Sequence, residues 1–307
     1  MGELLAIVSL FLFSLNTIVT RVAGKRLDLN TGFLISITVN VLFAVLLVAI
    51  QWLAGDGPEQ FRWFGFSMFL LSGLFSSYLG RYFYFDSIVK MGPSKASAFV
   101  ISNPLFTVII SWLFIGERLS PIQLVSAFIV LLGLFLVSYI PQTKPNEPGP
   151  ESAAAEAGRW RAWVASGALL ALLGSLFYAL GNISRGVGVQ SWNEPIIGGF
   201  LGALVGLLLH LVFNRNVKDF VRNVRAAEKK AVGLYALGGI LTISAQIGQV
   251  ASMHYIPIAI VTLITSSQAL FILPLSYFLL KNEENITRRI VFGNLLVLVG
   301  IGAILLT

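Results

Sequence analysis

The sequence has no cysteine and only two histidines, His210 and His254, in 307 residues. Disulfides and thiolate metal sites are therefore excluded, and two histidines so far apart predict neither a metal site nor a bound cofactor. Charged residues make up 11% of the chain, against roughly a quarter in soluble domains. Hydrophobic residues make up 56%, and the mean hydropathy is +0.84. These values predict a helical multi-pass membrane protein with too little chain outside the bilayer to form a soluble enzyme.

Ten apolar stretches approach the length of about 20 residues that a helix needs to cross a bilayer. We expect spans near 4–22, 32–53, 64–89, 95–115, 121–140, 163–185, 195–213, 231–254, 258–280 and 288–306. The stretches are too long for barrel strands and do not alternate as such strands do. The first stretch lacks a preceding Lys or Arg and a cleavage site, so we interpret it as a retained helix. The predicted fold class is all-α integral membrane.

The ten spans divide into two similar halves. Residues 141–160 hold four prolines and many polar residues, which is typical of a surface linker. The halves are then 1–140 and 161–307, with five spans each. The matched pairs are Glu117 with Glu284, Ser120 with Thr287 and Gly133 with Gly300, each 167 residues apart, and Pro93 with Pro257, which are 164 apart. Because five is odd, the second half enters the membrane in the opposite orientation, which predicts two inverted five-helix repeats.

Three motifs carry a family resemblance. GERLS at 116–120, MGPSKASAFVISNPLFTVIISWLF at 91–114 and LGNISR at 180–185 resemble the EamA-type repeats of the drug/metabolite transporter superfamily. The resemblance implies a transporter of two five-helix units, with spans three and eight lining a central cavity, and it favours export. The second half departs from the motif, since 281–284 reads KNEE and lacks the glycine of GERLS.

The basic residues predict the orientation. With the adjacent helix ends, the connections after the odd-numbered spans hold 17 of the 21 Lys and Arg residues. The other connections hold three, Arg62, Arg118 and Arg185, and Arg81 lies within span three. The positive-inside rule predicts that the side with 17 basic residues is cytoplasmic. Both termini are then expected on the extracytoplasmic side of the inner or plasma membrane. Family members usually have cytoplasmic termini. The net charge of +7 then reflects topology and anionic lipid headgroups, not nucleic acid.

Arg81 is the leading candidate for a substrate contact. It lies roughly 12 Å of helix rise from the cytoplasmic end of span three. A charge at such depth usually faces a cavity or a partner, and guanidinium can hold a carboxylate or phosphate through two parallel hydrogen bonds. The alternatives are snorkelling to the headgroups and an ion pair with Asp86.

Arg81 adjoins one face of span three, and the repeat relates this face to one face of span eight. Tyr78, Tyr82 and Phe85 share one face of span three. An offset of 164 carries them to Thr242, Gln246 and Gln249 in span eight, which predicts a wet cavity between the two spans. The alternatives are packing for the aromatic residues and interhelical hydrogen bonds for the glutamines.

Other spans supply further polar residues. Asn103 in span four and Ser267 in span nine are expected to contribute to the site, whereas Asn16 and Asn182 are interpreted as structural hydrogen-bonding residues. No carboxylate lies deep in any predicted span, which argues against coupling through a mid-membrane acid. The spacing of Gly198, Gly202 and Gly206 predicts a packing face within the bundle or in a dimer.

Together these features predict a secondary transporter that moves an amino acid or a similar small amphipathic or anionic solute by alternating access, as an exporter or exchanger. The competing classes are a membrane-embedded enzyme or lipid-handling protein, and a channel or sensor. The enzyme class would need paired acids, a His-rich motif or a nucleophile with a base at depth, and we find no catalytic residues of this kind. The expected partners are the small-molecule substrate and membrane lipids, with the chain as a monomer or homodimer.

Overall fold

The computed structural model describes residues 1–55, 59–91, 96, 99, 102–138, 167–213, 217–279 and 288–306, and every regular element among them is helical. In chain order these are α1 Gly2–Gly24, α2 Leu29–Leu53, α3 Trp63–Ser72, η1 Gly73–Gly80, α4 Arg81–Met91, α6 Ser102–Ile110, η2 Ser111–Ile115, α7 Pro121–Ser138, α9 Ala168–Ser191, α10 Pro195–Phe213, α11 Val217–Ala226, α12 Lys229–Tyr255, α13 Ile258–Ser266, α14 Ala269–Leu279 and α15 Arg288–Leu305.

Most of these helices are long and apolar enough to cross a membrane. Seven helical segments within the described ranges qualify by length and composition. Three shorter apolar segments, Ser102–Ile115, Pro121–Val137 and Ile258–Ile272, accompany them. The chain is therefore a multi-pass membrane protein built from helices. The predicted linker, 141–160, lies outside the described residues.

Two spans are less regular than the sequence predicts. Span three changes from α-helix to the π-helix η1 and back, so α3, η1 and α4 form one continuous rod. Span nine is interrupted at Ser267–Gln268, between α13 and α14. The interruption contains neither glycine nor proline. The expected span over 258–280 is therefore formed by two helical segments in succession.

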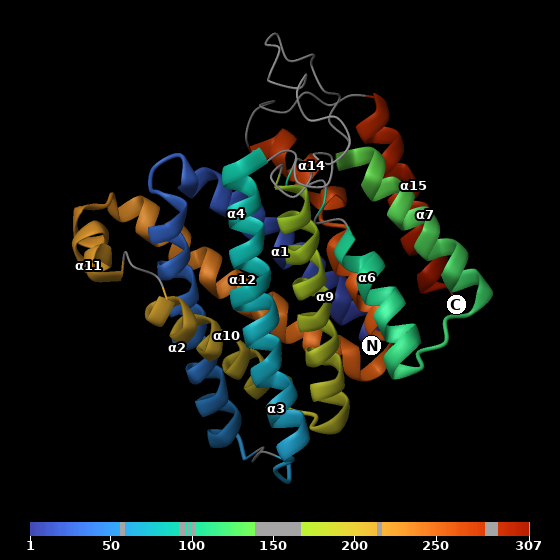
Figure 1. Cartoon of the computed structure of the whole chain (residues 1–307), viewed down its shortest axis with the longest axis horizontal. Coiled ribbons are helices and arrows are strands. Elements are labelled where there is room, and N and C mark those ends of the chain that lie inside the picture. Colours follow the sequence, from blue (N-terminus) through green and yellow to red (C-terminus); the bar gives the residue numbers. More distant parts are fainter. Residues whose placement is uncertain are drawn as a thin grey trace, which may run out of the picture.

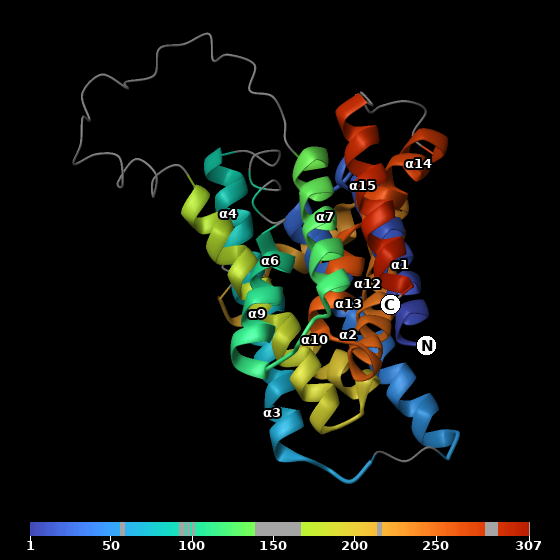
Figure 2. The same cartoon turned by 90° about the vertical axis from the view of Figure 1, so that its right-hand side faces the viewer.

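The helices form a bundle in which distant parts of the sequence pack together (Figures 1 and 2). Helix α1 packs along α12, and α9 packs along the rod of α3, η1 and α4. Helix α2 contacts α10, and α7 pairs with α15 at the right-hand side of the bundle in Figure 1. Every one of these pairs joins the first half of the chain to the second, so the two halves are interleaved.

Glycines allow several of these helices to approach closely. A Cβ atom at Gly133 of α7 would lie 2.6 Å from the carbonyl oxygen of Gly293 in α15. In α10, Gly198 faces the ring of Phe69, and Gly206 faces Ser77. The glycine stripe of α10 thus packs inside the bundle, against α3 and η1. Small residues at helix contacts are the usual means of close packing in membranes.

Two carboxylates near helix ends accept hydrogen bonds from neighbouring N–H groups. Glu117 accepts hydrogen bonds from the backbone N–H groups of Ile258 (2.7 Å) and Ala259 (3.3 Å), the first residues of α13. Glu194, which is 2% exposed, accepts from the Gln51 amide (3.1 Å) and the Glu59 backbone N–H (2.6 Å). An acid at a helix N-terminus satisfies unpaired N–H groups and favours the helix dipole. These acids therefore hold the ends of the bundle together.

Candidate functional site

A polar cavity of about 400 Å³ lies inside the bundle, between α1, α2, η1, α9 and α12. Helices α6, α10 and α13, the start of α4, and Gln268 between α13 and α14 complete its wall. Its polar lining residues are Asn16, Thr20, Ser36, Asn40, Ser76, Ser77, Arg81, Asn103, Tyr178, Asn182, Arg185, Tyr235, Thr242, Gln246, Gln249, Thr265, Ser266 and Gln268. A buried polar cavity in a membrane protein is costly unless its groups bind one another, water or a solute.

The cavity occupies one half of the bundle, and an apolar core closes the other half. On α1, the lining residues follow Leu10, whereas on α9 they precede Val189. Leu10 and Val189 belong to a buried cluster with Phe69, Trp192 and Met253. On the cavity side, by contrast, the lining residue Leu29 is 50% exposed. The cavity therefore extends toward the end of the bundle where α1 ends and α2 begins.

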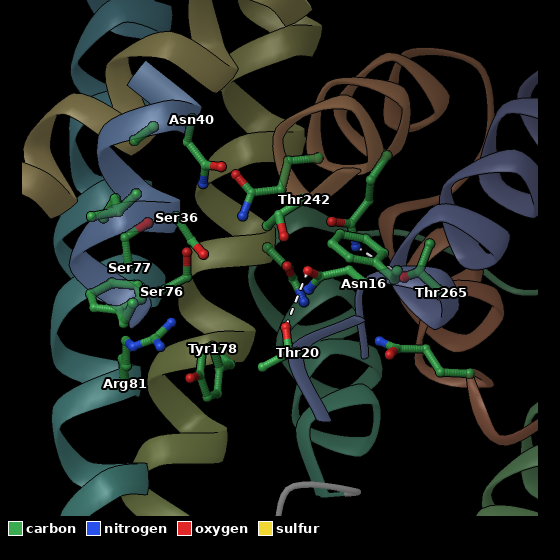
Figure 3. A pocket seen from close by; sticks show the side chains of 18 of the residues that line it. Asn16, Thr20, Ser36, Asn40, Ser76, Ser77, Arg81, Tyr178, Thr242 and Thr265 are labelled. Carbon is green, nitrogen blue, oxygen red and sulfur yellow. Dashed lines mark hydrogen bonds between the residues drawn. The ribbon is translucent and has the colours of Figure 1, made fainter. Parts of the chain in front are cut away.

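Arg81 projects into this cavity from the first position of α4, directly after the π-helix (Figure 3). Its guanidinium carbon lies 3.1 Å from the ring centroid of Phe33 and 4.9 Å from that of Phe85. Such cation–π contacts compensate part of the cost of a desolvated charge. Asp86, the alternative partner, lies instead 3.7 Å from the Lys90 ammonium. Within the described residues Arg81 forms no ion pair.

A second arginine, Arg185 of α9, lines the same cavity and is 8% exposed. Its Nη2 donates a hydrogen bond to Ser76 Oγ at 2.6 Å. Assigning Arg185 to a connection was wrong, because α9 continues to Ser191 and places the side chain inside the bundle. The small residues after Arg185 were the available sequence signal, since GVGVQS is a poor connection but a good packing face.

Amides and hydroxyls form most of the remaining polar lining. Gln249 Nε2 donates to Thr265 Oγ1 at 2.9 Å, and Asn182 Nδ2 donates to Asn103 Oδ1 at 3.4 Å. Gln246 and Asn16 also line the cavity. Figure 3 shows Asn16, Thr20 and Thr242 across the cavity from Arg81 and Tyr178. Of the residues predicted from sequence, the structure thus brings together Arg81, Asn103, Gln246 and Gln249. It adds Asn16 and Asn182, which the sequence analysis interpreted as structural hydrogen-bonding residues.

Three predicted residues do not line the cavity. Tyr78 and Tyr82 lie in an adjoining groove of about 580 Å³ between the start of α2, α4 and the end of α10. This side groove also contains Leu29, Phe33 and Arg81, so it borders the cavity at these three residues. A π-helix holds more residues per turn than an α-helix, and η1 accordingly turns the tyrosines away from the cavity. Ser267 is fully buried and donates to the Leu263 carbonyl oxygen at 2.9 Å.

The charged side chains in the described lining of the cavity are all positive. Two guanidinium groups line it, and no aspartate or glutamate belongs to the described lining. Asp28 and Asp86 lie in the side groove, where Asp28 caps α2 by accepting from the Thr31 backbone N–H at 2.9 Å. The described lining therefore offers two positive charges and many hydrogen-bonding groups, without a carboxylate to balance the charges.

The sequence profile of the EamA-like transporter family matches residues 1–139 and 165–306. The chain belongs to the EamA-like transporter family. The two matched segments fall on either side of residues 140–164. Family membership makes the chain a membrane transporter of small solutes and, in this coarse sense, not an enzyme. It leaves the solute and the direction of transport open.

Solved structures support the fold. One crystal structure, described only as that of a protein, aligns over 100% of this chain and 99% of its own, with a TM-score of 0.71 and 18% identity. At this identity the likeness extends to the fold and not to the ligand. No curated protein matches the chain.

Proposed function

We propose that the protein is a secondary transporter that moves a small organic anion across the membrane by alternating access, as an exporter or exchanger. The observation that supports this most is the central cavity, where Arg81 and a wall of amides meet without a carboxylate in the described lining. A guanidinium binds a carboxylate or phosphate through paired hydrogen bonds, and amides orient the remainder of the solute. The side groove beside Arg81 provides space for an apolar part of the solute.

Alternating access is supported by repeat-related helix contacts. A Cβ atom at Gly73 would lie 2.7 Å from the Gly202 carbonyl oxygen, and one at Gly239 would lie 2.6 Å from that of Ser36. The positions correspond at one offset, since 239 − 73 and 202 − 36 both equal 166. In the first contact the glycine Cβ position is in the first half and the carbonyl oxygen is in the second half. In the second contact the equivalent positions have the opposite roles.

The pairing of α7 with α15 gives the same result at an offset of 167. Gly133 approaches the Gly293 carbonyl oxygen, and Gly300 approaches that of Ser126, with Cβ distances of 2.6 and 2.9 Å. Here 300 − 133 and 293 − 126 both equal 167. These contacts support ten helices in two inverted repeats, 1–140 and 161–307, with a pseudo-two-fold axis in the membrane plane. If each half adopted the conformation of the other half, the cavity would close at one side of the membrane and open at the other.

We further propose that the end of the bundle where α1 ends is cytoplasmic. Since Arg185 lies in the cavity, the basic residues in connections are biased even more strongly than 17 to 3 toward that side. Helix α11 in the connection 214–230 supports this orientation, because its Phe220 and Val224 pack on Ala23, Ile35 and Tyr235. A basic amphipathic helix at this position fits the cytoplasmic surface of a membrane. The cavity would then face inward.

The orientation can be tested with single cysteines. We expect Pro150→Cys and Asn223→Cys to react with an impermeant thiol reagent only after the cells are opened. Gln60→Cys, in the connection between α2 and α3, should react on intact cells and serves as the control in this cysteine-free chain. Labelling of positions 150 and 223 from outside would reverse the assignment.

The transport function can be tested with the purified protein in liposomes. Preloaded vesicles should exchange a labelled organic anion from a panel of carboxylates and phosphate esters faster than protein-free vesicles. Cations of similar size should not be exchanged, because the described lining offers them no acid. Exchange of cations without exchange of anions would contradict the proposal, as would hydrolysis or modification of a panel compound without transport.

A further inference from the structure

The second arginine of the cavity points to the charge of the solute. Arg185 is more deeply buried than its position near a predicted helix end implied, and Ser76 Oγ accepts its hydrogen bond. A serine hydroxyl is neutral, so it orients the guanidinium without neutralising it. Within the described residues Arg185, like Arg81, forms no ion pair. Both charges thus face the cavity without a counter-ion among the side chains that the structure describes.

The two guanidinium groups lie on the same wall. Arg185 is bonded to Ser76, which precedes Arg81 by five residues on the same rod, or roughly 7 Å of helix rise. Tyr178 of α9 lies beside Arg81 on this wall, with Ser76 and Ser77 above them (Figure 3). One small molecule with two anionic groups can therefore reach both arginines at once.

Electrostatics favours such a molecule over a singly charged or zwitterionic one. Burying one unpaired charge in a membrane costs several kcal/mol, and an anion recovers part of that cost only where its own charge is placed. A single carboxylate on Arg81 would leave Arg185 uncompensated. The ammonium group of an amino acid would enter a cavity that already holds two positive charges, where like charges repel strongly.

We infer that Arg185, positioned by Ser76, is a second anion-binding residue beside Arg81, and that the transported solute is a small organic dianion, either a dicarboxylate or a phosphate monoester. The inference rests on the proposed function, because it assumes that the cavity carries the solute. In a dicarboxylate, one carboxylate would bind Arg81 and the other Arg185, whereas in a phosphate monoester the single phosphoryl group carries both charges and its oxygens would bind both guanidinium groups. Amides such as Gln246 and Asn182 would bind the polar groups of the solute.

The test compares probes that differ in one charge. Succinate and its monoamide, succinamate, have nearly the same shape, and glycerol 3-phosphate represents the phosphate monoesters. In liposomes the wild-type protein should exchange at least one of the two dianions at least tenfold faster than succinamate. A preference for succinate would identify a dicarboxylate carrier, and one for glycerol 3-phosphate a phosphate-ester carrier.

Variants of Arg185 test whether this residue causes the preference for dianions over succinamate. Arg185→Gln should lower the dianion preference below threefold while succinamate is still exchanged, since Arg81 remains. Arg185→Lys keeps the charge but loses the planar fork, so it should retain an intermediate preference. If the glutamine variant does not fold, the lysine variant is compared with wild type, and an unchanged preference there overturns the inference.

Two further outcomes are decisive. Equal exchange of succinamate and the dianions by wild type, or an undiminished preference in Arg185→Gln, would refute the dianion inference and leave anion transport intact. Failure of the wild type to exchange any carboxylate or phosphate ester would instead refute the proposed function itself. Thermal stabilisation of the detergent-solubilised wild type by each probe gives a second measure of the same preference.

Discussion

Arg81→Gln is expected to reduce anion transport by about two orders of magnitude while the protein still folds and inserts. Hydrogen bonds to a charged group are worth about 1.5–3 kcal/mol each, and 1.4 kcal/mol corresponds to a factor of ten. The wild-type guanidinium lies in the cavity against the Phe33 ring, where glutamine fits without a charge. The measurement is initial exchange rate and apparent affinity in liposomes with the best anion of the panel.

Two controls make this result specific. Arg81→Lys keeps the charge but cannot form the bidentate pair, so its transport should fall between those of wild type and Arg81→Gln. Arg62→Gln removes an exposed arginine just before α3 and should leave transport unchanged. Wild-type rate and affinity in Arg81→Gln would show that Arg81 stabilises the bundle and does not bind the anion.

Gly293→Leu in α15 is expected to cause a large loss of stability. A Cβ atom at this position would lie 2.8 Å from the Gly133 carbonyl oxygen and 2.8 Å from Val137 Cγ2. The first of these atoms is backbone, so the clash can be relieved only by separating α7 from α15. Overpacking of a tight contact typically costs about 1–3 kcal/mol. The midpoint of thermal unfolding in detergent should therefore fall by several degrees, with a lower yield of folded protein.

Gly302→Leu provides the matched control on the same helix. No atom lies within 4 Å of a Cβ placed at Gly302, so leucine there should be tolerated. Both variants make the same chemical change and differ only in the neighbour that the side chain meets. Equal thermal stability of the two would mean that α7 and α15 do not pack as described.

The sequence determined which parts of the chain form apolar helices. Each of the ten expected spans overlaps at least one described helix, because about 20 apolar residues have no other low-energy arrangement in lipid. The matches of Glu117 with Glu284 and Gly133 with Gly300 were also available from the sequence and led to the family. Arg81 was found in the same way, since an isolated charge in an apolar run is conspicuous without any structure.

The arrangement of the site was decided by tertiary structure. The offset of 164 paired Tyr78 with Thr242, but the contact of Gly73 with Gly202 requires an offset of 166, which pairs Ser76 with Thr242. The π-helix η1 accounts for this difference, because it accommodates additional residues in the first half just before Arg81. Ser76 and Thr242 both line the cavity, whereas Tyr78 lies in the side groove.

Arg185 is the clearest example of a residue whose position was decided by tertiary structure. Its sequence neighbourhood was ambiguous between a helix end and a helix interior, and only the packing of α9 against η1 places it beside Ser76. Local sequence fixes how apolar a segment is and hence whether it enters the bilayer. Which side of a helix faces a cavity depends on the rotation of that helix against its neighbours, and this rotation is set by contacts between residues far apart in the chain, such as Gly73 with Gly202.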